Sequence, residues 1–380
     1  MKLAPNFCMI LALLLGSAGI SWGADFEAGS TAYNNGDYAT ALIEWEPLAE
    51  RGDAVAQNNL GVMYELGEGI SQNIKTAMMW YRLAAEQGHV DAQYNLGIVY
   101  FKDEQGTTQD NKSAVKWFTL AAEQGHADAQ NYLGVMYERA PGIPHDEKTA
   151  VKWLTLAAEQ GVVGAQYNLG LMYFKGDQGI AQNDKTAIKW FTLAAEQGDT
   201  DAQNYLGVMY KRGQGIPQDS ETAVKWFTLA AEDGNADAQY NLGAMYERGS
   251  GISQSNKTAV EWFTLAAKQK QATAQYYLGM MYERGLGIPQ NEKTAVEWYK
   301  LAAKQGEVGA QFNLGVMYLS GQGIQKDPVH AHMWANIAVN NGDDDGIALR
   351  DEAEDILSPS QIEKAQELAR ECISKQYQDC

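Results

Sequence analysis

The chain has 380 residues, of which 45% are hydrophobic and 20% are charged, a composition typical of globular proteins. Its 48 acidic and 29 basic side chains give a formal net charge of −19. Nucleic acids and anionic membrane surfaces are bound through clustered Lys and Arg, so this charge argues against both as partners. The charge favours basic partners, or it serves only to keep a long open surface from self-associating.

Residues 1–23 are predicted to be a secretory signal peptide that is removed before folding. Lys2 is the only charge before Asp25, and the apolar run at residues 7–15 is too short to span a bilayer. Residues 21–23, Ser-Trp-Gly, then offer small residues at the −3 and −1 positions of a cleavage site. We expect the mature chain to be exported and to contain no integral membrane segment. An uncleaved membrane anchor is the alternative.

Eight repeated units follow a half-degenerate one at residues 24–52, which is expected to cap the N-terminal end. Each unit carries an Ala-Gln pair, the motif L-G-x-x-Y, a glycine-bearing turn and a stretch rich in aromatic residues. Apolar residues recur at helical spacing on both sides of the turn, which predicts a helix, a turn and an antiparallel helix. The predicted units are 53–88, 89–125, 126–161, 162–198, 199–234, 235–270, 271–306 and 307–342, which together span 53–342.

The start of each second helix is marked by Asn, Asp or Ser, residues whose side chains accept hydrogen bonds from unpaired backbone N–H groups. These capping residues are Asn73, Asp110, Asp146, Asn183, Asp219, Ser255, Asn291 and Asp327.

Eight of the ten tryptophans share one later position, from Trp80 to Trp334, and we expect them to pack in the core or between paired helices. The glycine of each L-G pair should let the second helix approach closely, so a bulky residue there would open the pair.

A longer period is superimposed on the repeat. Units 89–125 and 162–198 both read Y-N-L-G, whereas the units after them, 126–161 and 199–234, both read N-Y-L-G. The offset of 73 residues indicates that a block of two units was duplicated.

Residues 343–380 are expected to form capping helices, of which the last is amphipathic and runs from Gln361 to about Ile373. Because an exported chain can form disulfides, Cys372 and Cys380 would pair and tie the tail to this helix; a frayed tail with free thiols is the alternative.

The segment from Asn341 to Glu352 fits the spacing of a calcium-binding loop, with Asn in place of the first Asp. It also fits a plain turn and helix start, the interpretation that we favour.

The motif L-G-x-x-Y followed by A-x-x-x-aromatic resembles the tetratricopeptide repeat, but the turn G-x-G-I-x-Q is longer here. A large aromatic residue of that repeat is also replaced by Gln57, Gln93, Gln130 and their equivalents. Together with the ending W-[FY]-x-x-A-A-x-Q-G, these features are similar to the Sel-one-like repeat family. The resemblance implies an all-α, right-handed α-solenoid superhelix of stacked antiparallel helix pairs. It also implies an adaptor or scaffold, since exported bacterial members are associated with envelope assembly, signalling or host contact.

We therefore expect a non-catalytic scaffold of the bacterial cell envelope, periplasmic or secreted, monomeric and without a cofactor. Its expected partner is a protein or peptide, not nucleic acid. The alternatives are an envelope hydrolase, β-lactamase-like or acting on peptidoglycan, and a calcium-modulated adaptor. Residues 113–116 match the S-x-x-K motif of such hydrolases, but the sequence has no S-D-N or K-T-G companion. A cysteine-rich branch of the family carries that label, and this chain has no cysteine within its repeats.

The histidines do not form a metal-binding pattern. His89 and His126 fall at equivalent turns, where we expect them to be solvated. His330 and His332 are two residues apart on a helix and therefore do not share a face. No zinc site is expected.

By analogy with tetratricopeptide solenoids, the first helices are expected to line a concave face. An apolar and aromatic strip edged by arginines would suit an extended peptide or a partner helix. Alternatively, the tyrosines only pack between adjacent first helices. The candidate binding residues are Tyr94, Tyr167, Tyr240, Tyr276, Phe312, Arg139, Arg212, Arg248 and Arg284.

Overall fold

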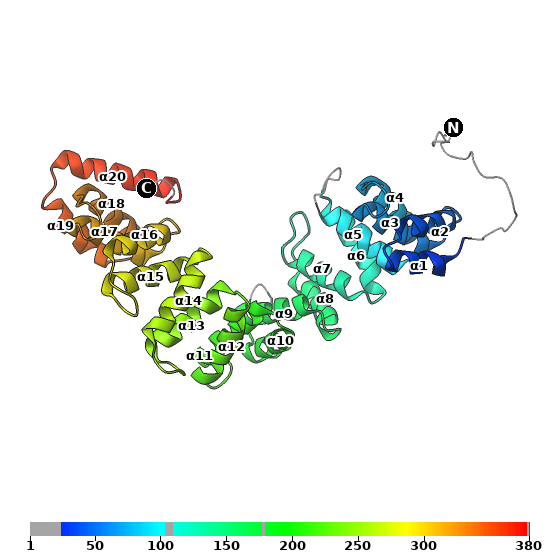
Figure 1. The fold of residues 1–380 in the computed structure, drawn as a ribbon, viewed down its shortest axis with the longest axis horizontal. Coiled ribbons are helices and arrows are strands. Elements are labelled where there is room, and N and C mark those ends of the chain that lie inside the picture. Colours follow the sequence, from blue (N-terminus) through cyan, green and yellow to red (C-terminus); the bar gives the residue numbers. More distant parts are fainter. Residues whose placement is uncertain (1–23, 103–108, 177–178, 378–379) are drawn as a thin grey trace. The chain divides into compact units, whose positions relative to one another are not determined.

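The computed structural model describes residues 24–102, 109–176, 179–377 and 380, so the predicted signal peptide lies outside the described residues. The described part of the chain folds into twenty helices and contains no strand (Figure 1). It divides into two compact units, one ending at His145 and the other running from Asp146 to Cys380. The predicted all-α fold of paired, stacked helices is confirmed.

Seven helices belong to the first unit: α1 (Phe26–Asn34), α2 (Tyr38–Glu50), α3 (Ala54–Leu66), α4 (Ile74–Glu86), α5 (Val90–Phe101), α6 (Asn111–Glu123) and α7 (Ala127–Arg139). The second unit contains α8 (Glu147–Glu159), α9 (Val163–Lys175), α10 (Asp184–Glu196), α11 (Thr200–Arg212), α12 (Ser220–Glu232), α13 (Ala236–Arg248), α14 (Asn256–Lys268), α15 (Ala272–Arg284), α16 (Glu292–Ala303), α17 (Val308–Ser320), α18 (Pro328–Asn340), α19 (Asp345–Glu354) and α20 (Pro359–Ser374).

The hydrophobic core of each unit is a row of small clusters. Each cluster joins the second helix of one repeat to the first helix of the next. In the first unit, for example, Tyr81 and Ala84 of α4 are buried together with Leu96 of α5. In the second unit, α12 joins α13 and α14 joins α15 in the same way. A repeat is therefore stabilised by its immediate neighbours, as in other solenoids.

The N-caps predicted for the second helices are confirmed at all eight positions. Asn73 Oδ1 accepts a hydrogen bond from the Thr76 N–H at 3.1 Å. Asp219 accepts from the Thr222 N–H at 3.1 Å and from its hydroxyl at 2.6 Å. These side chains satisfy donors that have no partner within the helix, which fixes where each second helix begins.

The tryptophan column is core packing only in part. Trp117, Trp190 and Trp334 are buried, whereas the other five members are half-buried. The most deeply buried aromatic position lies one residue later. It holds Tyr81, Phe118, Phe191, Phe227, Phe263 and Tyr299, all 0% exposed.

The L-G glycines, where a close approach of the second helix was predicted, lie against the aromatic rings of this second column. A Cβ atom built on Gly207 would lie 2.5 Å from the Phe227 ring, and one on Gly61 would lie 2.4 Å from the Tyr81 ring. Real Cβ atoms do not come this close to a ring, so a side chain at either position would force the paired helices apart. The glycine therefore makes room for the ring that follows the tryptophan.

Within each unit, a ladder of buried amides links first helices to neighbouring second helices. In α5, Gln93 Nε2 donates to the Ala85 carbonyl at 3.1 Å, and Gln93 Oε1 accepts from Gln124 Nε2 at 2.8 Å. Gln57, Gln166, Gln239 and Gln275 repeat both bonds. The glutamine that departs from the tetratricopeptide pattern thus satisfies backbone and side-chain groups inside the stack.

The ladder is incomplete at Gln203. Asp233 occupies the position where most other repeats carry the donating Gln, and the buried Gln203 Oε1 has no hydrogen-bond partner among the described residues. We expect Asp233→Gln to raise the free energy of unfolding by about 1 kcal/mol, because it supplies the missing donor. It also removes a carboxylate from the C-terminus of α12.

Urea denaturation followed by circular dichroism would measure this gain. The matched control is Gln269→Asp in the next repeat, which removes the 2.9 Å bond to Gln239 and should lower stability by a similar amount. If Asp233→Gln left the free energy of unfolding unchanged while Gln269→Asp lowered it, Gln203 Oε1 would already be hydrogen-bonded to water.

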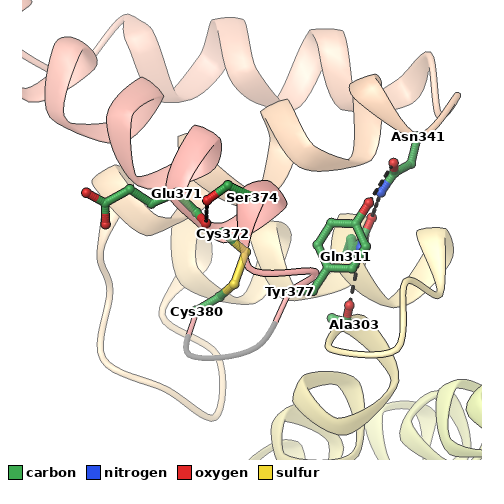
Figure 2. The surroundings of a disulfide bond; sticks show 8 residues. All are labelled: Ala303, Gln311, Asn341, Glu371, Cys372, Ser374, Tyr377 and Cys380. Carbon is green, nitrogen blue, oxygen red and sulfur yellow. Dashed lines mark hydrogen bonds between the residues drawn. A yellow bond between two sulfur atoms is a disulfide. The ribbon is translucent and has the colours of Figure 1, made fainter.

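The C-terminal cap closes the second unit (Figure 2). Its last helix, predicted from Gln361 to about Ile373, is α20, and it buries Ala369 and Cys372 against the final repeat. Cys372 is disulfide-bonded to Cys380. The loop between them places the Tyr377 hydroxyl 3.0 Å from Asn341 Oδ1, to which it donates a hydrogen bond.

Candidate functional site

Ser113 and Lys116, the outer residues of the S-x-x-K match, serve helix structure. The Ser113 hydroxyl donates to Asp110 Oδ2 at 2.7 Å, and its N–H donates to Oδ1 at 3.1 Å. Lys116 Nζ lies 5.1 Å from the centroid of the Trp117 ring. Ser113 therefore reinforces the N-cap of α6, and Lys116 makes a cation–π contact on the same helix.

The expectation that His89 and His126 are solvated is wrong. Each ring accepts a hydrogen bond through Nδ1, from the N–H of Ala92 or Ala129 at 3.2 Å, and so caps a first helix. His332 is fully buried between Glu354 Oε1 at 2.8 Å and Asn336 Nδ2 at 3.0 Å. These histidines stabilise helix starts and the contact between α18 and α19.

The residues at the calcium-like spacing have other partners. Asn341 Nδ2 donates to Gln311 Oε1 at 2.9 Å while its Oδ1 accepts from Tyr377 (Figure 2). Asp343 Oδ1 accepts from the Asp345 N–H at 3.1 Å, and α19 begins at Asp345. Across the described residues, no group of three or more His, Cys, Asp or Glu is placed to hold a metal ion. The structure favours the plain turn and helix start.

Three of the predicted binding residues lie in aromatic packing between repeats. The Tyr94 ring stacks on His126 with centroids 4.4 Å apart and contacts Tyr132 at 6.0 Å. Tyr167 contacts Phe191 and Tyr205, both at 6.1 Å. These rings are half-buried and fill the space between neighbouring first helices.

Tyr240 is placed in the same way, whereas the ring contacts of Tyr276 lie within its own repeat and its contact with the next repeat is with Gly309 of α17. Tyr240 lies 5.5 Å from Tyr277, and Tyr276 lies 5.6 Å from Tyr277 and 6.0 Å from Tyr299. Burial, followed by the proximity of Tyr277, raises the pKa of both phenols. For these four tyrosines, the geometry favours the alternative in which they pack between repeats.

Two kinds of contact join neighbouring first helices within each compact unit, and the 73-residue period repeats the aromatic kind. Aromatic contacts join α5 to α7 through Tyr94 and Tyr132, and α9 to α11 through Tyr167 and Tyr205. Amide contacts take their place between α3 and α5 and between α11 and α13. There Asn95 Nδ2 donates to Asn58 Oδ1, and Asn241 Nδ2 donates to Asn204 Oδ1, both at 3.1 Å. The Y-N and N-Y variants of the motif supply the side chains for these contacts, although the buried Asn131 Oδ1 of α7 has no hydrogen-bond partner among the described residues.

The four predicted arginines are all exposed and end their helices. Arg139, Arg212, Arg248 and Arg284 are the last residues of α7, α11, α13 and α15. A cation at this position stabilises a helix through its dipole, and the side chains stay available to solvent. Arg248 Nη2 also reaches the Tyr277 hydroxyl at 3.5 Å.

Phe312 is the predicted site residue that lies in an open cavity. Unlike the four tyrosines, it makes no ring contact among the described residues. It lies in a groove of about 620 Å³ between α17 and α19, hereafter the C-terminal groove. The groove is lined by Phe312, Val316, Leu319, Ser320 and Lys326 on one side and by Asp345, Ala348, Leu349, Glu352 and Ile356 on the other.

The α19 side of this groove was missed by sequence reasoning. Ala348, Glu352 and Ile356 are spaced by four residues each, so they fall on one face of α19 and the turn after it. This spacing was a usable signal, but the segment was interpreted only as a turn and a cap. Ile356 is 55% exposed, an unusual environment for a residue of its size and polarity.

The chain belongs to the Sel1 repeat family. The sequence profile of the Sel1 repeat matches eight times, at residues 54–89, 90–126, 127–162, 163–199, 200–235, 236–270, 272–307 and 308–343. Sel1 repeat proteins are generally protein-interaction scaffolds, and the family is typically non-catalytic. No helix in the described part of the chain is both long and apolar enough to cross a membrane.

Two solved structures are similar over most of the chain. A Sel1 repeat protein from Oxalobacter formigenes is 32% identical over 90% of this chain and 98% of its own, with a TM-score of 0.65. The protein c5321 of uropathogenic Escherichia coli, a protective antigen with an SLR fold, is 31% identical over 93% of this chain and 85% of its own, with a TM-score of 0.60. No curated protein matches the chain.

Proposed function

We propose that this protein is a non-catalytic interaction scaffold that acts outside the cytoplasm, in the periplasm or after secretion, and binds a partner protein. The observation that carries the proposal is the C-terminal groove, where the half-buried Phe312 and Val316 pack against Leu349 of α19 and still line a cavity of about 620 Å³. A hollow of this size with apolar side chains in its lining is typical of a binding site for another molecule.

Two features support action outside the cytoplasm. Residues 1–23 have the pattern of a secretory signal peptide. The Cys372–Cys380 disulfide persists in oxidising compartments, whereas cytosolic thiols are kept reduced. The engagement of Ser113 and Lys116 in helix capping and packing supports a role without catalysis.

Site-specific photo-crosslinking in the native host tests the proposal. A photoreactive residue would replace Ile356 in the groove, Leu229 on α12 or Ile43 on α2, all of which are exposed. We expect one partner protein to crosslink saturably at one or more of these positions, in the periplasmic or secreted fraction. The purified protein should hydrolyse neither nitrocefin nor peptidoglycan. Saturable crosslinking at none of the positions, or turnover that co-purifies with the chain, would contradict the proposal.

A further inference from the structure

We propose that the C-terminal groove binds a basic amphipathic helix of the partner protein, with its apolar face on the groove floor and Lys or Arg against the acidic rim. This inference rests on the proposed function and names the chemistry of the partner.

The floor of the groove has the form that accepts a helix. Phe312, Val316 and Leu319 follow one another at helical spacing on α17. Leu349 and Ile356 face them from α19 and the turn after it. An apolar row on one helix that faces further apolar side chains forms the kind of groove into which the apolar face of another helix fits.

The groove exists because the space between α17 and α19 lacks the side-chain pair that fills the equivalent space elsewhere in the stack. Between other first helices the space is occupied by a ring pair, such as Tyr240 and Tyr277, or by an amide pair, such as Asn204 and Asn241. Opposite Phe312, α19 contributes Ala348 and Glu352 instead. The resulting volume of about 620 Å³ lies within the roughly 300–1,000 Å³ typical of ligand pockets, which suits a few bulky side chains from one segment.

The acidic side chains of the rim favour a basic occupant. Residues 343–357, which supply the α19 side of the groove, carry seven acidic side chains and one basic one, a net charge of −6, and of the acidic ones Asp345 and Glu352 line the groove. Glu354 is engaged by His332 and Asp351 by Arg350, but Glu352, which lines the groove, has no ion pair or hydrogen bond among the described residues. An apolar segment bearing Lys or Arg would pair with this carboxylate. The only basic residue of the lining is Lys326.

The test uses the full chain and a fluorescent peptide of about 18 residues, enough for five helical turns, in which Leu forms one face and Lys the other. Three comparison peptides separate the contributions of the apolar face, the positive charge and the helical conformation. They are a scrambled sequence without an apolar face, a version with Glu in place of Lys, and a version kept extended by prolines. Fluorescence anisotropy gives the dissociation constants. Vesicles of anionic phospholipid serve as a non-protein probe.

Ile356→Asp is expected to weaken binding of the Leu/Lys peptide by about tenfold, which corresponds to about 1.4 kcal/mol. The matched control is Ile347→Asp, which adds the same charge to the same helix outside the groove at a residue that is 40% exposed, and should change affinity by less than about twofold. Glu352→Lys should weaken binding and reduce its dependence on salt. Thermal melting by circular dichroism would verify that each variant is folded.

Several results would overturn the inference. The protein could bind the scrambled or the Glu-containing peptide as tightly as the Leu/Lys peptide, or it could bind the proline-bearing peptide or the vesicles more tightly. Ile356→Asp and Ile347→Asp could also weaken binding of the Leu/Lys peptide equally. If these occur while a partner still crosslinks saturably at Leu229 or Ile43, the scaffold function stands and only the occupant of the groove is wrong.

Discussion

Phe263→Ala is expected to lower the free energy of unfolding by about 3–5 kcal/mol, the usual range for truncating a fully buried Phe. Phe263 is 0% exposed, and its ring lies against Gly243 of the paired helix and 5.3 Å from Tyr277 of the next repeat. Truncation leaves a cavity that involves two helix pairs. Because each repeat depends on its neighbours, the loss should spread to adjacent repeats.

Trp262→Ala is the matched comparison, since it removes a larger side chain one residue earlier. Trp262 is only half-buried, against the core of the preceding repeat, so we expect a cost of about 1–2 kcal/mol. Urea denaturation by circular dichroism would measure both variants, and hydrogen exchange would locate the weakened repeats. A larger loss for Trp262→Ala than for Phe263→Ala would show that the tryptophan column is the main core after all.

Cys372→Ser is expected to lower the stability of the C-terminal cap by about 2–3 kcal/mol, as estimated from the loop entropy that the disulfide removes from the unfolded chain. The two cysteines are eight residues apart. The bond closes a loop that contains Gln376 and Tyr377, which have positive φ angles of 53° and 63° that non-glycine residues adopt rarely. Without it, these residues should relax and the Tyr377–Asn341 hydrogen bond should be lost.

Hydrogen exchange of α20 and limited proteolysis of the tail would reveal the weakened cap. The wild-type protein treated with a reducing agent should behave like Cys372→Ser, and the variant itself should not respond to the reductant. Unchanged protection of α20 in both cases would show that packing of Ala369 and Cys372 holds the helix without the covalent bond.

The helices could be predicted because their signals are local. Asn73 and its equivalents mark helix starts by a side-chain bond to a backbone group three residues away, and the glycine turns mark the helix ends. The burial order of the aromatic columns could not be predicted. Trp262 and Phe263 are adjacent and both apolar, and only the position of the facing Gly243 decides which ring enters the core.

The site was predictable to a smaller extent. Phe312 was included as a candidate, but three tyrosines of equal status pack against rings roughly one repeat away and Tyr276 packs against Gly309, contacts that spacing within one helix does not reveal. The other side of the groove comes from α19, whose Leu349 and Ile356 are too few for a clear apolar stripe. Which residues face one another there depends on the tertiary structure.

The ring and amide contacts limit how the chain can change its length. Removing the single repeat 199–234 would bring Tyr167 of α9 against Asn241 of α13, leaving a ring beside an amide. Removing the two repeats 199–270 would instead bring Tyr167 against Tyr277 of α15 and restore a ring pair. At this point in the chain, a deletion of two repeats should therefore be tolerated better than a deletion of one.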